Sequence, residues 1–342
     1  MSCMLLPLFV VSMLQNQASA QNEILVTFDG TPATASSSSN NGMCTCVPEG
    51  TCSSATTNID IRIVNTGSNC SAGQVYCCSP TSGHLLDTTC GIRKITSSSH
   101  TEGQANYGAY PWQAVLLTTS NGYAGSGVLI TPNHILTAAH KVASYTNGGI
   151  KVRLGERNDQ STSELYPVRE YTVRKVAVHP NFNSVNLQND VAVLTLSGTV
   201  PISSSPNINT ACFPSAVPPA NTRCWVSGWG KDAFGANGKY QSTMKEVDVP
   251  IVDDATCEAA LRRTRLGQSF SLSKGSFLCA GGEPGKDACT GDGGSPLVCQ
   301  SGNGQWQVVG LVAWGIGCAT QNVPGVYVNV YNYISWIMQQ LN

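Results

Sequence analysis

The sequence predicts an all-β protein that is closed by one C-terminal helix and preceded by a small disulfide-rich module. From Gln104 onward, short apolar runs such as "WQAVLLTT", "SGVLI" and "DVAVLTL" are separated by Gly, Pro and Asn, as in a β-barrel or β-sandwich. Six cysteines lie between Cys44 and Cys78, in a segment too short to build a core of its own. Four apolar residues near the end recur at helical spacing: Ile334, Ile337, Met338 and Leu341.

The first 43 residues are not expected to belong to the folded part. Residues 1–20 have an apolar centre and end in Ala18-Ser19-Ala20, a small-x-small cleavage pattern, although the usual basic start is missing. We interpret them as a signal peptide rather than a membrane anchor, because the apolar run is too short to span a bilayer. Residues 21–43 are polar and predict a flexible tail. The chain is therefore expected to be secreted, without a membrane span.

Charge and cysteine content narrow the function classes. The 342 residues carry 19 Lys and Arg against 20 Asp and Glu, so no phosphate-binding face is indicated and nucleic acid is not an expected partner. Removal of Cys3 with the signal peptide leaves an even number of the 15 cysteines, as expected in an oxidising compartment. Zinc is disfavoured because "CTC" and "CC" lack the usual spacer between ligands. Disulfides are the better interpretation, although the sequence alone permits fifteen pairings of the first six cysteines.

Three separated motifs carry the chemistry. "LTAAH" ends at His140, "NDVAVL" places Asp190 before an apolar run, and "CTGDGGSPLVC" runs from Cys289 to Cys299. This order, supported by "YPWQAVLL", "CWVSGWG", "WGIGC" and "PGVY", resembles the chymotrypsin-like serine proteases over residues 104–342. Residues 44–78 resemble a clip domain, and residues 79–103 are then a linker. The chain is identified as a clip-domain serine protease homolog, which implies a chymotrypsin-like double β-barrel.

The resemblance also implies how all fourteen cysteines pair. The clip pattern and the protease pattern together imply seven disulfides: Cys44–Cys77, Cys46–Cys70, Cys52–Cys78, Cys90–Cys212, Cys224–Cys299, Cys257–Cys279 and Cys289–Cys318.

The nucleophile is missing from the motif. An active relative has Gly-Asp-Ser-Gly-Gly-Pro in this loop, and the Ser attacks the substrate carbonyl after giving its proton to the His. Here that position is Gly293, so no acyl-enzyme can form, and loss of a nucleophile costs about 10^6 in kcat. Ser295 lies two residues further on and is not expected to reach the same point. His140 and Asp190 are therefore interpreted as a remnant of the triad that helps the fold.

Other departures from the family pattern agree. Ala313 stands where a Ser usually supports the Asp, and Gly125 and Lys141 replace a disulfide that braces the His. Residues 99–102 replace the cleavage site whose new N-terminus normally pairs with the carboxylate at Asp292. The resemblance thus implies a protein that does not cut, with an active trypsin-like protease as the disfavoured alternative.

The resemblance also implies a substrate-binding pocket. Asp287 occupies the position of the carboxylate that receives Lys or Arg in trypsin-like members, and Gly315 and Gly325 match the small residues that keep this pocket open. A carboxylate can hold a cationic side chain without catalysis. A collapsed pocket is the alternative interpretation.

A regulatory cleavage is also indicated. Arg62-Ile63 lies in the loop between Cys52 and Cys70 and resembles a trypsin-type cleavage site. A cut after Arg62 would leave the two pieces joined by disulfides. Alternatively, Arg62 is a solvent-exposed arginine in a strand-like segment, without a role in cleavage. Arg93 and Lys94 in the linker are an alternative cleavage site.

Two further features are weak. Glu156 and Glu164 lie where some relatives bind calcium, but their spacing does not match, so no metal and no cofactor is predicted. Asn69-Cys70-Ser71 is formally a glycosylation sequon with a half-cystine in the middle.

The resemblance implies a function in innate immunity. Members of this non-catalytic group in arthropod haemolymph act as cofactors in prophenoloxidase activation, the cascade that deposits melanin. The expected partners are prophenoloxidase or its activating clip-domain protease, an upstream trypsin-like protease that cleaves the chain, and a second copy after cleavage. Recognition of microbial surfaces or an adhesion role is the alternative function.

Overall fold

In the computed structural model, the described residues are 44–48, 74–78, 89–96, 101–146, 148–160, 164–231, 239–286, 292–317 and 320–341, the first two ranges for their backbone only. Strands β1 (Cys44–Pro48) and β2 (Gln74–Cys78) pair antiparallel, with Cys44 opposite Cys78. The predicted signal peptide, the polar tail, Arg62-Ile63 and the Asn69 sequon lie outside the described residues.

Six strands of the N-terminal half close into the first barrel. Its hydrogen-bonded order is β3-β4-β5-β8-β7-β6. The strands are β3 (Gln113–Thr118), β4 (Tyr123–Thr131), β5 (His134–Thr137), β6 (Ile150–Leu154), β7 (Arg169–Val178) and β8 (Ala192–Leu196). β5 and β8 are buried over their whole length, because closure of the barrel leaves their apolar side chains no exposed edge.

Six strands of the C-terminal half close into a second barrel. Its order is β10-β11-β14-β13-β12-β9. The strands are β9 (Arg223–Gly228), β10 (Lys245–Val252), β11 (Phe277–Gly281), β12 (Pro296–Gln300), β13 (Trp306–Trp314) and β14 (Pro324–Asn329). The chymotrypsin-like double β-barrel expected from the sequence is thereby confirmed.

The two barrels share a buried seam. The Gln113 side chain on β3 donates to the Ser227 carbonyl at 3.2 Å, and the Ser227 hydroxyl donates back to Gln113 at 3.0 Å. Gln113 and Ser227 are both almost fully buried, and Trp112 beside them is completely buried. Satisfied polar groups in such a seam fix how the barrels meet, because unpaired ones would be costly there.

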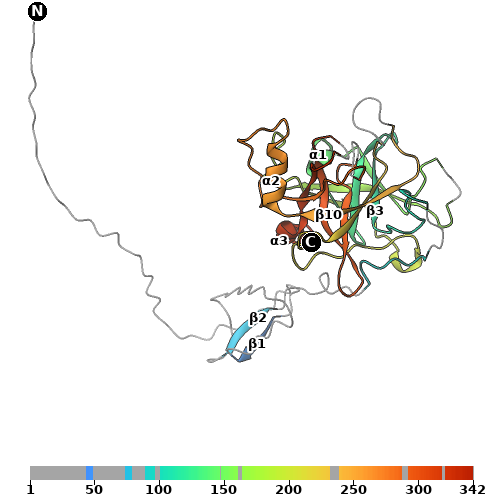
Figure 1. Cartoon of the computed structure of the whole chain (residues 1–342). Helices are drawn as coiled ribbons and strands as arrows, with labels where there is room; N and C mark the ends of the chain where they lie inside the picture. The colour runs from blue at the N-terminus through green and yellow to red at the C-terminus, as the bar shows by residue number, and fades with distance from the viewer. Residues whose placement is uncertain are drawn as a thin grey trace, which may run out of the picture. The chain divides into compact units, whose positions relative to one another are not determined.

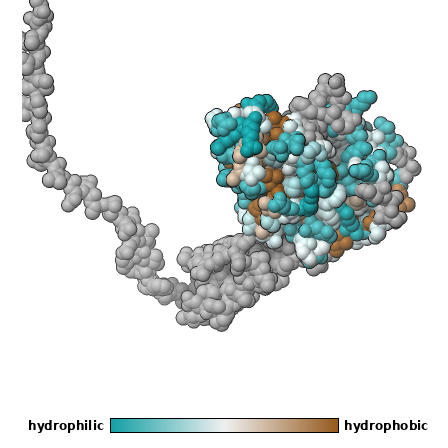
Figure 2. Space-filling view, in the orientation of Figure 1, coloured by the Kyte–Doolittle hydropathy of each residue, from teal (hydrophilic) through white to brown (hydrophobic). Residues whose placement is uncertain are grey.

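Short helices complete the domain: α1 (Ala139–Val142), α2 (Asp254–Arg262) and α3 (Val330–Gln339), with single 3₁₀ turns at Ala143–Tyr145 and Ile202–Ser204. α3 is the predicted C-terminal helix, and it buries Val330, Tyr333 and Ile337. Figure 1 shows α2 at the periphery of the folded domain and the C-terminus beside α3. The face drawn in Figure 2 has small brown patches between larger teal areas, and no single broad apolar surface.

Candidate functional site

His140 and Asp190 form a close, partly buried pair. The Nδ1 atom of His140 lies 2.7 Å from one carboxylate oxygen of Asp190, and the backbone N–H of His140 donates to the other at 2.7 Å. The Asp190 side chain is fully buried, while the His140 side chain is 26% exposed. One of these bonds holds the imidazole and the other holds the His140 backbone, so the Nε2 atom faces away from Asp190, toward Gly293 in the loop before β12.

The elements around this pair explain its position. β5 ends in Thr137, whose hydroxyl donates to the Ser126 carbonyl on β4 at 2.7 Å, and α1 begins two residues later. Asp190 follows Asn189, which adopts a left-handed conformation with φ of 56°. The Asn189 side chain donates to the Asn181 carbonyl and accepts from the Tyr333 hydroxyl on α3. The C-terminal helix therefore supports the turn that presents Asp190.

Asn189 was missed by the sequence interpretation. Its signal was available, because Asn tolerates the left-handed conformation and stands directly before the functional Asp in "NDVAVL". The contact with Tyr333 could not be found, since the two residues are far apart in the sequence.

Gly293 lies where the third group of a triad would stand. A β-carbon placed on Gly293 would lie 2.8 Å from His140 Nε2 and 3.2 Å from His140 Cε1. The carbonyl of Gly293 accepts from the Ser126 amide at 3.2 Å, and the Gly294 amide donates to the Val312 carbonyl at 2.9 Å. The loop is thus anchored to both barrels, and a side chain at position 293 would point directly at the imidazole.

Ser295 does not face this point. Its side chain is fully buried, its hydroxyl has no hydrogen-bond partner among the described residues, and the oxygen lies 3.0 Å from a β-carbon placed on Gly228. It therefore points into the second barrel rather than toward His140.

Asp292 is also directed inward. The residue is 9% exposed, and one carboxylate oxygen accepts from the Gly230 amide at 2.8 Å. Thr101 and Glu102, in the segment where an activated relative has its new N-terminus, are exposed and follow residues outside the described range. Ala313 on β13 is buried and carries no hydroxyl.

The residues of the predicted pocket are described only in part. Gly325 lies on β14 opposite Ala280, and Gly315 directly follows β13 with only the Gly317 carbonyl near its missing side chain, at 3.6 Å. Asp287 lies outside the described residues. The use of this pocket stays a prediction.

Three disulfides are present at pairs that the resemblance implies: Cys90–Cys212, Cys224–Cys299 and Cys257–Cys279. Cys289 and Cys318 lie outside the described residues, as do the side chains of the six cysteines between Cys44 and Cys78. The other four pairings therefore stay predictions.

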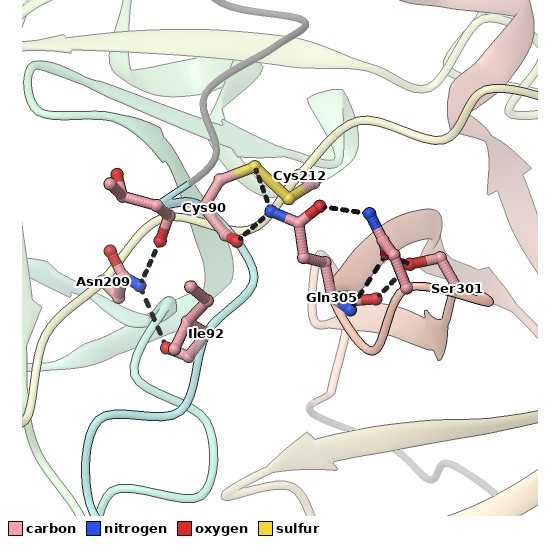
Figure 3. The surroundings of a disulfide bond; sticks show 8 residues. Cys90, Ile92, Asn209, Cys212, Ser301 and Gln305 are labelled. Carbon is pink, nitrogen blue, oxygen red and sulfur yellow. Dashed lines mark hydrogen bonds between the residues drawn. A yellow bond between two sulfur atoms is a disulfide. The ribbon is translucent and has the colours of Figure 1, made fainter.

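Residues 89–96, which we call the strap, are fastened to the second half of the domain. Figure 3 shows the Cys90–Cys212 disulfide at its centre, with Asn209 and Gln305 on either side. Asn209 donates to the carbonyls of Thr89 and Ile92, at 2.8 and 2.9 Å, and Gln305 donates to the Cys90 carbonyl at 3.0 Å. The backbone of the strap is therefore held on both sides of the disulfide.

The side chains of both basic residues of the strap are held by contacts within the protein. The Arg93 guanidinium lies 4.2 Å from the centre of the Trp306 ring, a cation–π distance. The Lys94 ammonium donates to three backbone carbonyls, those of Ile202, Ser205 and Ile208. A protease that recognises Arg or Lys would have to pull these side chains out of place.

Glu156 and Glu164 use their carboxylates within the protein. Glu164 accepts from the amides of Arg157 and Asn158, and Glu156 lies 3.3 Å from the Arg153 guanidinium. Burial, the largest cause, raises the pKa of Glu156 above its usual value, and the charge of Arg153 opposes this. Among the described residues no three His, Cys, Asp or Glu side chains converge on a metal position.

Comparisons with known proteins agree with this geometry. A model of the trypsin family matches residues 101–337. Over 324 residues the chain is 49% identical to "Inactive CLIP domain-containing serine protease A3" of Aedes aegypti, covering 87% of this chain and 67% of that protein. It is 46% identical over 252 residues to "Phenoloxidase-activating factor 2" of Galleria mellonella, covering 69% and 82%. It is 40% identical over 220 residues to "Trypsin-3" of Salmo salar, covering 63% and 82%.

Proposed function

We propose that this chain is a secreted cofactor of prophenoloxidase activation. The proposal starts from its family: the chain belongs to the trypsin family, as a non-catalytic clip-domain serine protease homolog of the immune system. It acts outside the cell, in haemolymph. Proteolytic cleavage of the chain switches it on, and its partners are prophenoloxidase and the protease that activates it.

One observation carries the non-catalytic part of this proposal. His140 and Asp190 keep a hydrogen-bonded pair, and the Nε2 atom of His140 faces the position of a side chain that Gly293 does not have. We assign the loss of catalysis to this glycine, because an imidazole can only activate a nucleophile that is present. Several relatives carry the word inactive in their names, as expected if such a loss is shared.

The cofactor role is supported by likeness. "Phenoloxidase-activating factor 2" aligns with 82% of its own length, so the likeness extends over most of a protein that is named for this cascade. The part of the chain that the structure describes has no helix long and apolar enough to cross a membrane.

The strap supports a cleavage at Arg62 rather than in the linker. Proteases prefer segments that can move into their active site, and although Arg93 and Lys94 are exposed, their side chains are held by an aromatic ring and by three carbonyls. We therefore propose that the activating cut falls after Arg62, within the predicted clip domain. The processed chain should then begin a new N-terminus at Ile63 while its parts stay joined by disulfides.

A reconstituted assay tests the proposal. Prophenoloxidase and its activating protease are mixed with and without this protein, pre-cleaved after Arg62 and checked by N-terminal sequencing for an Ile63 start. An Arg62→Gln variant, treated in the same way, is the matched control. We expect phenoloxidase activity to rise several-fold with the cleaved protein and to stay at the background level with the variant.

Other outcomes contradict specific parts. A fall in activity would mean that the chain competes for the partners instead of assisting them. Equal activity with the Arg62→Gln variant would reject the cleavage site, and a new N-terminus in the strap would do the same. No effect of either form would reject the cofactor role for these components and leave recognition of microbial surfaces as the function to test.

A further inference from the structure

Gly125 and Lys141 face one another beside the remnant of the triad. Gly125 lies on β4, and Lys141 is the third residue of α1, directly after His140. A β-carbon placed on Gly125 would lie 3.3 Å from the β-carbon of Lys141. This distance is close to the 3.5–4.5 Å that separates two half-cystines, so the backbone here keeps the approach of a disulfide although neither residue is a cysteine.

The stem of Lys141 passes both glycines of this region. A β-carbon on Gly125 would lie 2.5 Å from the Cε atom of Lys141, and a β-carbon on Gly293 would lie 2.9 Å from its Cδ atom. Non-bonded carbon atoms prefer separations of about 3.5–4.0 Å. Neither position can therefore carry a side chain while Lys141 stays where it is.

The charge of Lys141 contributes less to the stability of the folded protein than the packing of its side chain does. No carboxylate among the described residues lies within ion-pair distance of its ammonium group. Burial, the largest cause, lowers the pKa of Lys141, while the charges of Asp292 and Asp190 raise it. A lowered pKa means that the folded protein holds the charged form less readily than the unfolded chain does. Lys141 therefore stabilises the folded protein through the packing of its aliphatic stem rather than through its charge.

We infer that the stem of Lys141 occupies the space beside His140 that a disulfide at positions 125 and 141 and a nucleophile at position 293 would otherwise take. Gly125, Lys141 and Gly293 then act as one unit, in which the lysine stem crosses the space that a side chain at either glycine would need, beside the His140 ring at Gly293. Entry of a substrate-like segment beside His140 from this side requires Lys141 to move. Lys141 thus acts as a space-filling residue, and this inference does not depend on the proposed cofactor role.

A double-mutant cycle in the full chain tests this unit. The variants are Gly125→Ala, Lys141→Ala and the double variant, and the readout is the melting temperature. We expect Gly125→Ala to lower Tm by about 2–12 °C, because overpacking is destabilising. In the Lys141→Ala background the same change should cost less, since the contact with Cε is gone and the nearest remaining atoms lie at 3.3 Å. Any backbone strain at Gly125, whose φ is 158°, is common to both backgrounds and cancels in the difference.

Gly198→Ala is the matched control for this cycle, because a β-carbon there would meet nothing nearer than 3.6 Å. Its effect on Tm should be small and equal in both backgrounds. If Gly125→Ala costs as much in the Lys141→Ala background as in the parent protein, the inference is wrong.

Lys141→Met separates volume from charge. Methionine keeps a stem of similar length but has no ammonium group, so Tm should not fall, and Gly125→Ala should remain costly in this background. Lys175→Met, at an exposed lysine on β7, controls for loss of a charge. A fall in Tm with Lys141→Met as large as that with Lys141→Ala would also overturn the inference.

A cysteine pair covers the case in which Gly125→Ala does not fold. The double variant Gly125→Cys with Lys141→Cys removes the lysine and supplies the disulfide together. We expect a quantitative disulfide by mass spectrometry and a Tm that falls on reduction. Two free thiols in a folded protein would show that the two positions do not face one another as described.

Discussion

At the scale of single residues, the site is a hydrogen-bonded His140–Asp190 pair whose imidazole faces a glycine, Gly293. In the proposal made above, this glycine stands at the position of the nucleophile. The pair has a structural use. Without its two hydrogen bonds to His140, the buried carboxylate of Asp190 would be an uncompensated charge, which would destabilise the fold.

Asp190→Ala tests that structural use. The change removes the acceptor of the His140 amide and of its imidazole, both at 2.7 Å, in a position without solvent access. We expect a loss of about 3 kcal/mol in the free energy of unfolding, because hydrogen bonds to charged groups contribute about 1.5–3 kcal/mol each. Denaturant unfolding measures this directly. His140→Gln should leave the phenoloxidase effect unchanged, and a selective loss of that effect in a stable His140→Gln protein would show that the pair still acts in function.

At the scale of elements, α3 holds the first barrel through aromatic contacts. The His179 ring on the segment after β7 lies 4.9 Å from the Trp336 ring and 5.4 Å from the Tyr333 ring, between ring centres. Tyr333 also supports Asn189, so the docking of α3 and the position of Asp190 are linked.

This contact predicts a pH dependence of stability. Burial lowers the pKa of His179, so the folded protein favours the neutral ring. The stabilising contribution is therefore present above the ordinary histidine pKa of about 6.5 and is lost as the pH falls through the lower folded value. We expect Tm to fall between pH 7.5 and pH 5, and His179→Phe, which keeps an aromatic ring, to reduce this slope. Equal slopes in both proteins would contradict the assignment.

Elements also show how far the sequence could predict the structure. The runs "WQAVLLTT" and "DVAVLTL" correspond to β3 and β8, because strands buried in a closed barrel need continuous apolar sequence. α2 was not predicted. It buries only Cys257, Ala260 and Leu261, so its periodicity is weak, although Asp253 caps its first turn by accepting from the Thr256 amide.

The site shows the same limit. His140, Asp190 and Gly293 were found because each motif is local in the sequence, and Ser295 could be placed from the same motif as Gly293. Asn189 was missed, although it stands in the motif of Asp190. The path of Lys141 could not be predicted, because it depends on two glycines that only the fold brings together. Packing between distant segments is what single-sequence reasoning lacks.

At the scale of the whole molecule, the chain keeps a protease scaffold for a purpose other than cutting. Two closed barrels, a shared polar seam and a strap fixed by the Cys90–Cys212 disulfide preserve the shape of a trypsin-like domain. A scaffold of this kind can present loops to partners with little change on binding. The proposed role as a cofactor depends on the surface of the domain and requires no catalysis by the His140–Asp190 pair.

Labelling with a fluorophosphonate probe tests the central claim, that this domain works without a nucleophile. The probe forms a covalent bond only with an activated serine, so the protein cleaved after Arg62 is incubated beside an active trypsin of equal concentration. We predict complete labelling of trypsin and none of this chain, by intact mass. Stoichiometric labelling that maps to Ser295, or to any other serine of the chain, would contradict the claim and identify an active hydrolase.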